Sequence, residues 1–165
     1  MGGVKFGAAL AAMLVLAGCS SVPVAVKEPG NDAAAGAGLN VPAGSNEDFI
    51  VNVGRRIFFD ANSAAVGETA AETLGKQAEW LTRYPAYKIK IEGFSDEPGS
   101  AEANRALGLK RAEAAKAFFA SKGIALARMR VKSFGNSRPV RKCDDVACAV
   151  QNRRVVTVLD TEIGS

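Results

Sequence analysis

The residue of this 165-residue chain with the most distinctive chemistry is Arg111, a charged side chain on a helix face that is otherwise apolar. A helix with about 3.6 residues per turn places Arg111 within the apolar arc of the segment that follows Ser100. Asn104 projects in nearly the same direction, close to the start of that helix. A buried guanidinium needs an anionic partner, because an unpaired buried charge costs several kcal/mol. Asp96, in the turn before the helix, is the nearest candidate by chain geometry. The apolar arc comprises Leu107, Gly108, Ala112, Ala114, Ala115, Phe118 and Phe119.

Two interpretations of Asp96 and Arg111 are open at this point. They form either a structural salt bridge or a pocket in which the carboxylate and the guanidinium hold the ammonium and carboxylate of a zwitterionic ligand.

The motifs around these residues carry a family resemblance. They are Gly93-Phe-Ser-Asp-Glu-Pro-Gly99, Asn104, Leu107-Gly108, Arg111-Ala112 and Asn152-Arg153-Arg154-Val155. Together they resemble the OmpA-like C-terminal domains, and most of all the peptidoglycan-associated lipoproteins of Gram-negative bacteria. The similarity runs from about Arg56 to Leu159 and so covers nearly all of the expected folded part.

The resemblance implies a ligand and a role for each residue. In that family, the aspartate and arginine that match Asp96 and Arg111 bind the free amino-acid end of meso-diaminopimelate in the peptidoglycan stem peptide. Asp96 would accept hydrogen bonds from the ammonium group, and Arg111 would pair with the carboxylate. Further expected ligand-binding residues are Gly93, Phe94, Ser95, Asn104, Leu107 and Arg153.

The chain departs from the family pattern at two positions near this pocket. Phe94 stands where the family usually has histidine, and it has a simpler interpretation as a core side chain. Pro98 stands where a basic or small residue is common, and it has no backbone N–H to offer a ligand.

The amino terminus predicts the location of the protein. Lys5 is followed by an apolar run, Phe6 to Leu16, that is too short to span a bilayer, and then by Leu16-Ala17-Gly18-Cys19. Residues 1–18 are therefore predicted to be a lipoprotein signal peptide, with an ordinary secretory signal as the alternative. Resemblance to bacterial lipoproteins implies acylation of Cys19, and Ser20 resembles the pattern that directs such proteins to the periplasmic face of the outer membrane.

Residues 19–47 are predicted to be a flexible linker, because prolines and glycines recur there without an apolar period. Such a linker reaches roughly 25–30 Å as a coil and about 75 Å when extended. Removal of residues 1–18 lowers the formal charge from +4 to +3, because Lys5 is lost. A net charge of +3 is too weak to suggest nucleic acid as a partner.

Residues 48–165 are expected to form one α+β domain, an OmpA-like β-α-β-α-β-β sandwich with a small mixed four-stranded sheet and two helices on one face. Strands are predicted over 51–59, 87–92, 129–134 and 154–159. Helices are predicted over 68–84 and 102–122, and Gly123 ends the second of them. A long loop, 135–151, connects the last two strands.

The three cysteines are expected to have two different roles. Cys19 is the expected lipid anchor, and Cys143 and Cys148 are expected to form a disulfide in an oxidising periplasm. Free thiols and a metal site with Asp144 and Asp145 are the alternatives, but two thiolates without histidine are a poor set of ligands. No metal or cofactor is expected.

The composition argues against catalysis. The chain has no histidine, which removes the Ser-His-Asp and Cys-His arrangements. A glycosidase pair could be drawn only from carboxylates with simpler explanations, Glu92, Asp96, Glu97 and Glu102. The expected function is therefore non-enzymatic: an outer-membrane lipoprotein that binds peptidoglycan as part of a Tol system. The alternatives are an adaptor for periplasmic Tol-type proteins such as TolB, and an OmpA-like lipoprotein outside any such system.

Overall fold

The computed structural model describes residues 41–142 and 146–160. The predicted signal peptide, Cys19, Cys143 and all but the end of the predicted linker lie outside these ranges. None of the described helices is both long and apolar enough to cross a bilayer.

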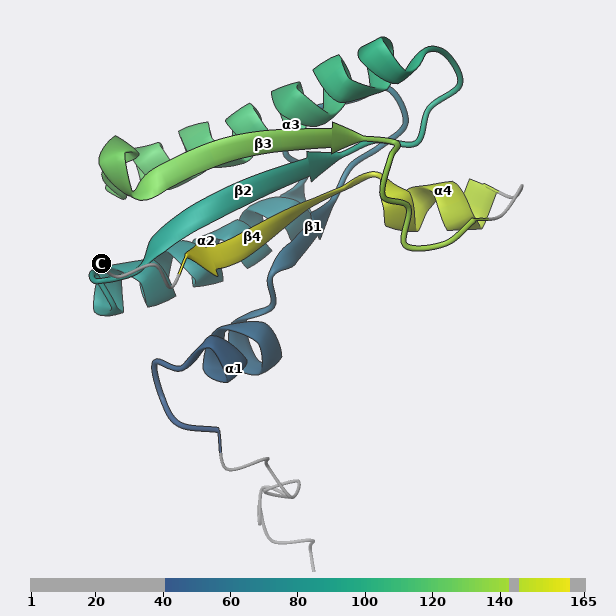
Figure 1. Cartoon of the computed structure of the whole chain (residues 1–165). Helices are drawn as coiled ribbons and strands as arrows, with labels where there is room; N and C mark the ends of the chain where they lie inside the picture. Colours follow the sequence, from purple (N-terminus) through teal and green to yellow (C-terminus); the bar gives the residue numbers. More distant parts are fainter. Residues whose placement is uncertain (1–40, 143–145, 161–165) are drawn as a thin grey trace, which may run out of the picture. The chain divides into compact units, whose positions relative to one another are not determined.

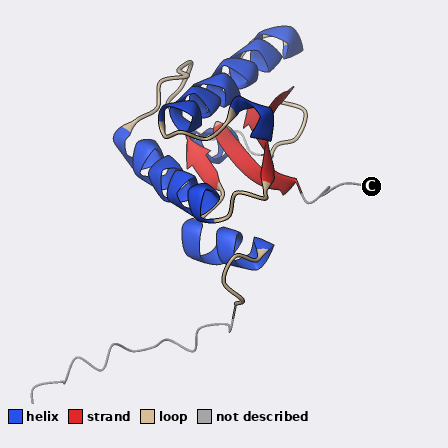
Figure 2. Ribbon diagram, turned by 90° about the vertical axis from the view of Figure 1, so that its left-hand side faces the viewer, coloured by secondary structure: helices blue, strands red, loops and turns tan. Residues whose placement is uncertain are grey.

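The domain is a four-stranded mixed sheet with two long helices on one face (Figures 1 and 2). The strands are β1 (Arg56–Phe58), β2 (Lys88–Phe94), β3 (Met129–Gly135) and β4 (Arg154–Asp160), in the spatial order β1-β4-β2-β3. Strand β4 is antiparallel to both of its neighbours, and β2 is parallel to β3. The predicted fold class and the order of the elements are confirmed.

The long helices are α2 (Glu68–Arg83) and α3 (Ala101–Ser121). Their apolar faces pack on the alternate side chains of the strands that point toward them, and these residues form one core. That core includes Leu74, Leu81, Ile89, Ile91, Ala112, Ala115, Phe119, Val155 and Leu159. Gly123 has a φ of +87° directly after the C-cap of α3, as the sequence predicts.

The first predicted strand is wrong over most of its length. Asn46–Asp48 is a short helix, α1, and Phe49–Val53 continues as a π-helical turn, so β1 begins only at Arg56. The Asp48 carboxylate accepts hydrogen bonds from the Trp80 indole at 2.8 Å and from the backbone of Gly44 at 2.8 Å. These contacts outweigh the β propensity of the valines.

The predicted loop 135–151 also contains a helix, α4 (Val146–Asn152). Its seven residues are too few to show a helical period in the sequence. Figure 1 shows α4 beyond the end of the sheet, on the same side as the loop that leads into α3. A 3-10 turn, η2 (Leu126–Arg128), precedes β3.

Helix α3 lies unusually close to β2 because two glycines face each other. A Cβ atom on Gly93 would lie 1.8 Å from the carbonyl oxygen of Gly108, and a Cβ on Gly108 would lie 2.6 Å from the Ser133 hydroxyl. The Leu107-Gly108 motif thus has a packing role: it brings the first turns of α3 down onto the strand.

We expect Gly93→Ala to lower the free energy of unfolding by about 3 kcal/mol or more, because the added methyl must push two backbones apart. Gly75→Ala is the matched control. No atom lies within 4 Å of a Cβ at Gly75, within α2, so this change should raise stability by about 0.5–1 kcal/mol. Urea unfolding of both variants measures the difference, and equal effects would contradict the close contact.

Candidate ligand-binding site

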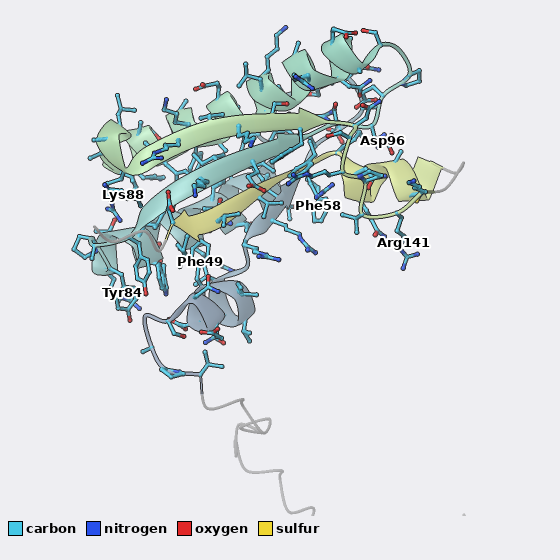
Figure 3. The ribbon with its side chains drawn as sticks, viewed as in Figure 1. Phe49, Phe58, Tyr84, Lys88, Asp96 and Arg141 are labelled. Atoms are coloured by element: carbon cyan, nitrogen blue, oxygen red, sulfur yellow. The ribbon has the colours of Figure 1, made fainter. Side chains whose placement is uncertain are left out.

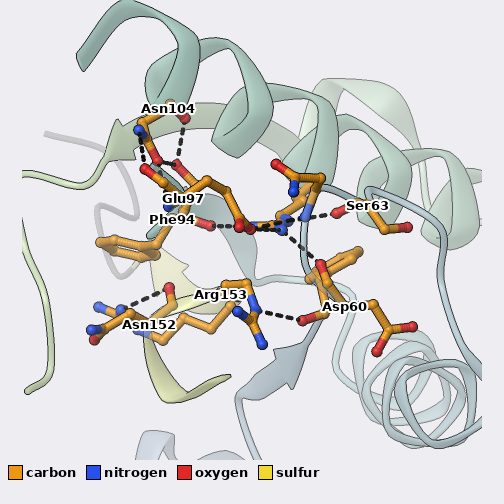
Figure 4. Close-up of polar contacts among 12 residues, drawn as sticks. Asp60, Ser63, Phe94, Glu97, Asn104, Asn152 and Arg153 are labelled. Atoms are coloured by element: carbon orange, nitrogen blue, oxygen red, sulfur yellow. Dashed lines mark hydrogen bonds and ion pairs between the residues drawn. The ribbon is translucent and has the colours of Figure 1, made fainter. Parts of the chain in front are cut away.

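The guanidinium of Arg111 is fully buried and links three segments of the chain. Nε donates to the carbonyl of Ser63 at 2.7 Å, Nη1 to the carbonyl of Phe94 at 3.1 Å, and Nη2 to the carbonyl of Asp60 at 2.9 Å. Nη2 also donates to Oε1 of Glu97 at 2.9 Å, which is the ion pair of this cation (Figure 4). Helix α3 thereby holds the loop after β1 and the carboxyl end of β2 together.

Burial lowers the pKa of Arg111, and the charge and hydrogen bond of Glu97 oppose that effect. The ring of Phe59 lies 5.5 Å from the guanidinium carbon and adds a cation–π contact. A guanidinium has five N–H groups, and the four bonds to described residues leave one N–H on Nη1. Arg111 is therefore satisfied without a ligand but retains one free donor within the described residues.

The partner of Arg111 is Glu97, so the first of the two interpretations, a structural salt bridge between Asp96 and Arg111, is wrong. Asp96 instead accepts a hydrogen bond from Nδ2 of Asn152 at 2.7 Å. Neighbouring residues in an extended turn direct their side chains to different sides, and the distance along the chain could not decide which carboxylate faces the helix. Asp96 remains partly exposed, whereas the side chain of Glu97 is only 7% exposed.

Asn104 fixes the shape of the loop between β2 and α3. Its Oδ1 accepts hydrogen bonds from the Ser95 hydroxyl at 2.8 Å and from the backbone of Glu97 at 2.9 Å. Its Nδ2 donates to the carbonyls of Glu97 at 2.9 Å and Ser100 at 3.1 Å. The single proton of the Ser95 hydroxyl is shared between this Oδ1 and the backbone carbonyl of Asn104 at 2.6 Å. The contacts of the amide to described residues all lie within the loop or at the start of α3, so Asn104 positions the loop.

Three other predicted site residues serve the packing of the same loop. Ser95 is buried and donates to the carbonyl of Asn104 at 2.6 Å. Gly93 lies against Gly108, and Leu107 is half-buried on the first half of α3. The structure thus brings these residues to the site as its support.

Phe94 is a buried packing residue, as the simpler interpretation predicts. Its ring stacks on Phe134 with centroids 5.3 Å apart, and the guanidinium of Arg154 lies 3.8 Å from its centroid on the sheet face opposite the long helices. Only the backbone carbonyl of Phe94 reaches Arg111. The ring therefore does not replace a family histidine as a polar group.

The end of α4 completes the site from the other side. Asn152 is buried and binds Asp96, the carbonyl of Arg141 at 2.9 Å and the backbone of Val140 at 2.7 Å. Arg153 is also buried, and its Nε donates to the carbonyl of Phe59 at 3.4 Å, beside the site (Figure 4). Cys148, one turn before Asn152, is buried and disulfide-bonded, although its partner lies outside the described residues.

The sequence reasoning missed four contributors to the site: Asp60, Ser63, Glu97 and Asn152. Asn152 had a signal, since it opens the late motif Asn152-Arg153-Arg154-Val155. Asp60 and Ser63 had none, because they contribute backbone carbonyls to Arg111. Asp60 also lines a small open hollow of about 210 Å³ between β1 and the start of α2, which offers space beside the site.

The loop after β2 offers groups of both charges for binding. A partly exposed carboxylate, Asp96, follows directly after the backbone that holds a buried guanidinium, so one loop presents both signs of charge. Within residues 41–142 and 146–160, no three histidine, cysteine or acidic side chains gather in a way that could hold a metal ion.

Comparison with known proteins assigns the family. The OmpA family model matches residues 58–153, more than half of the chain. The chain belongs to the OmpA family. The peptidoglycan-associated lipoprotein of Agrobacterium fabrum is 48% identical over 92% of this chain and 85% of its own length. That of Brucella melitensis is 51% identical over 92% of this chain and 89% of its own length.

Solved structures agree with this family assignment. The crystal structure of the peptidoglycan-associated lipoprotein from Burkholderia pseudomallei matches with a TM-score of 0.62 and 37% identity, over 64% of this chain and 90% of that one. The C-terminal domain of Helicobacter pylori MotB, 20% identical, shares the fold with a TM-score of 0.59, over 64% of this chain and 83% of that one.

We expect Glu97→Ala to lower the free energy of unfolding by about 3–5 kcal/mol, because it leaves the buried Arg111 without its ion pair. The matched control is Glu113→Ala, which removes an exposed carboxylate 3.9 Å from Lys116 and should cost less than about 1 kcal/mol. Chemical denaturation of both variants makes the comparison. Similar small losses would mean that Glu97 does not stabilise the cation.

Proposed function

We propose that the protein is an outer-membrane lipoprotein that binds peptidoglycan non-covalently and so tethers the outer membrane to the cell wall. The observation that carries this proposal is that the buried Arg111 binds the backbone of Phe94, two residues before the partly exposed Asp96. Both charged residues stand at positions that match the diaminopimelate-binding pair of the family. The names of the relatives at about half identity support the association with peptidoglycan and the lipoprotein character.

In the proposed binding mode, Asp96 accepts hydrogen bonds from the ammonium group of a meso-diaminopimelate residue in the stem peptide. In the structure the Glu97 carboxylate accepts a hydrogen bond from Nη2 of Arg111 at 2.9 Å. The ligand carboxylate binds Arg111 either by replacing this carboxylate or by accepting the free N–H on Nη1. Asn104 keeps the loop in shape for both contacts, and Arg153 lies at the edge.

The proposed anchor is an acyl-modified Cys19 after removal of residues 1–18. The linker then lets the domain reach the wall at roughly 25–75 Å from the membrane. The role is structural and non-catalytic. In this proposal the protein acts within a Tol system, with TolB and related periplasmic proteins as partners. The alternative is that the protein serves mainly as an adaptor for such proteins.

We expect Asp96→Asn to weaken binding of a stem peptide that contains meso-diaminopimelate by about 1.5–3 kcal/mol, because it removes the charge that faces the ammonium group. The amide can still accept the hydrogen bond from Asn152, so the fold should persist. Arg111→Ala should weaken binding by a similar amount, and Arg111→Lys should not restore it, because an ammonium cannot form a two-pronged contact. Isothermal titration measures all three.

The control for this experiment is Glu102→Gln, an exposed first-turn carboxylate of α3 outside the site. Circular dichroism must show that each variant is folded, since Arg111 also holds three segments together. Unchanged affinity in folded Asp96→Asn would remove the ligand-binding role of this carboxylate.

We expect Cys19→Ser to give a protein that is exported but not acylated, because serine lacks the thiol that accepts the lipid. Partitioning between detergent and water should therefore move from the detergent phase to the aqueous phase. Ser20→Ala, which leaves the thiol in place, is the control. Retention of the Cys19→Ser variant in detergent would show that the anchor lies elsewhere.

A further inference from the structure

No described helix covers the face of the sheet opposite α2 and α3 (Figure 3). The strand sequences place mainly basic residues among its charged members. Strand alternation assigns its members, because every second residue of each strand points away from the helices. The basic members are Arg56, Lys88, Lys90, Arg130, Lys132, Arg154 and Arg138, which follows β3. The acidic members are Glu92 and Asp160. We call this surface the basic face.

The basic face accounts for the whole positive charge of the protein. It holds seven of the 21 basic residues and two of the 17 acidic ones, a net charge of +5. The formal charge of the chain is +4, so all remaining residues together are close to neutral, with a net charge of −1. The positive charge is thus separated onto one side of the sheet rather than mixed over the surface.

Little of this charge is neutralised within the described residues. Lys90 pairs with Asp160 at 3.1 Å, and this is the only ion pair of 4 Å or less found on the face in the described part of the chain. Burial lowers the pKa of Arg154, with the charge of Arg56 acting in the same direction and Glu92 opposing it.

Aromatic rings hold several of these cations in place. Arg154 lies 3.8 Å from the centroid of Phe94, whose ring stacks on Phe134. Arg138 and Lys132 lie 4.0 Å and 4.9 Å from the centroid of Phe134. The resulting layered stack extends from β4 to the β3 edge and gives long cationic side chains a fixed arrangement.

The shape of the basic face suits a surface rather than a small ligand or a stable protein partner. Three strands of seven residues and one of three residues form it, with neighbouring strands about 4.8 Å apart, so the face is broad and open rather than concave. Aliphatic and aromatic groups lie among the cations, including the 47% exposed Phe58 on the edge strand. Such a mixture matches the interface of a bilayer, where phosphates lie beside acyl chains.

We propose that the basic face docks on the anionic phospholipid headgroups of a bilayer. The choice of a bilayer rests on the proposed lipid anchor, which would keep the domain within about 75 Å of one. The site around Asp96 lies at the end of the sheet and the basic face on its broad side, so the domain carries a second contact surface besides the ligand-binding loop.

The test uses the full chain with Cys19→Ser, so that no acyl group contributes. The protein is sedimented with vesicles of phosphatidylcholine, with and without phosphatidylglycerol, at low and high salt. We expect binding only to the anionic vesicles, and we expect it to disappear at about 1 M salt, where the screening length is about 3 Å. Absence of binding at low salt would overturn the proposal.

Two double variants with the same change in total charge separate the effect of the basic face from the effect of the protein's net charge. Arg130→Glu/Lys132→Glu changes two exposed residues of β3, whereas Lys76→Glu/Lys110→Glu changes two exposed residues of the long helices by the same total charge. The first should lower vesicle binding by at least about tenfold, and the second should retain most of it. Equal losses would show that net charge alone drives binding and would overturn the proposal.

Two further measurements resolve the remaining outcomes. One outcome to test for is that the protein binds polyglutamate but not anionic vesicles, with the polyglutamate binding lost in the Arg130→Glu/Lys132→Glu variant. That result would assign the basic face to an acidic protein partner and would show that the lipid assignment is wrong. Stem-peptide affinity of the β3 variant should be unchanged, so loss of vesicle binding with intact peptide binding separates this inference from the proposed function.

Discussion

The burial of one cation, the guanidinium of Arg111, is the constraint on which the rest of the site depends. Removing such a group from water is costly, and the cost is offset only if hydrogen-bond acceptors and an anion surround it. Three carbonyl oxygens from the loop after β1 and from the end of β2 provide the acceptors, and Glu97 in the loop between β2 and α3 provides the anion. Segments distant in the chain are therefore fixed relative to one another by a single side chain.

This arrangement requires a close approach of helix and strand. The two facing glycines, Gly93 and Gly108, let α3 descend onto β2, and Arg111 lies one turn further along the same helix face. Asn104 then shapes the intervening loop with four hydrogen bonds, which directs Glu97 toward the cation. The close helix–strand packing, the hydrogen-bonded loop and the ion pair therefore depend on one another.

The domain has two chemically different surfaces. At one end of the sheet, a small set of carboxylate and guanidinium groups lies within loops, an arrangement that favours a single zwitterionic group. Across the open side of the sheet, cations are spread over all four strands around a stack of aromatic rings. The first surface favours recognition of a specific residue and the second a diffuse anionic layer. The two proposed binding modes involve different surfaces of the domain and therefore do not compete.

The sequence by itself determined the elements with a strong local signal. Helix α3 was predicted within one residue at each end because its apolar residues recur on one arc and Gly123 ends it. Strand β2 was predicted because its apolar and charged residues alternate. The motifs likewise indicated the family. They also predicted Asp96 and Arg111 as ligand-binding residues, which stays a prediction. A buried charge within an apolar arc is a signal that needs no tertiary information.

Only the tertiary structure decided which groups meet. Arg111 pairs with Glu97 rather than with Asp96. The directions of these adjacent carboxylates depend on the conformation of their loop, which Asn104 of the next helix fixes through a hydrogen bond to the backbone of Glu97. The tertiary structure turned Phe49–Val53 into a helical turn through the contact between Asp48 and Trp80, which lie far apart in the chain. It also gathered on one face basic residues that the sequence distributes among four strands, because pairing order and strand alternation are not local properties.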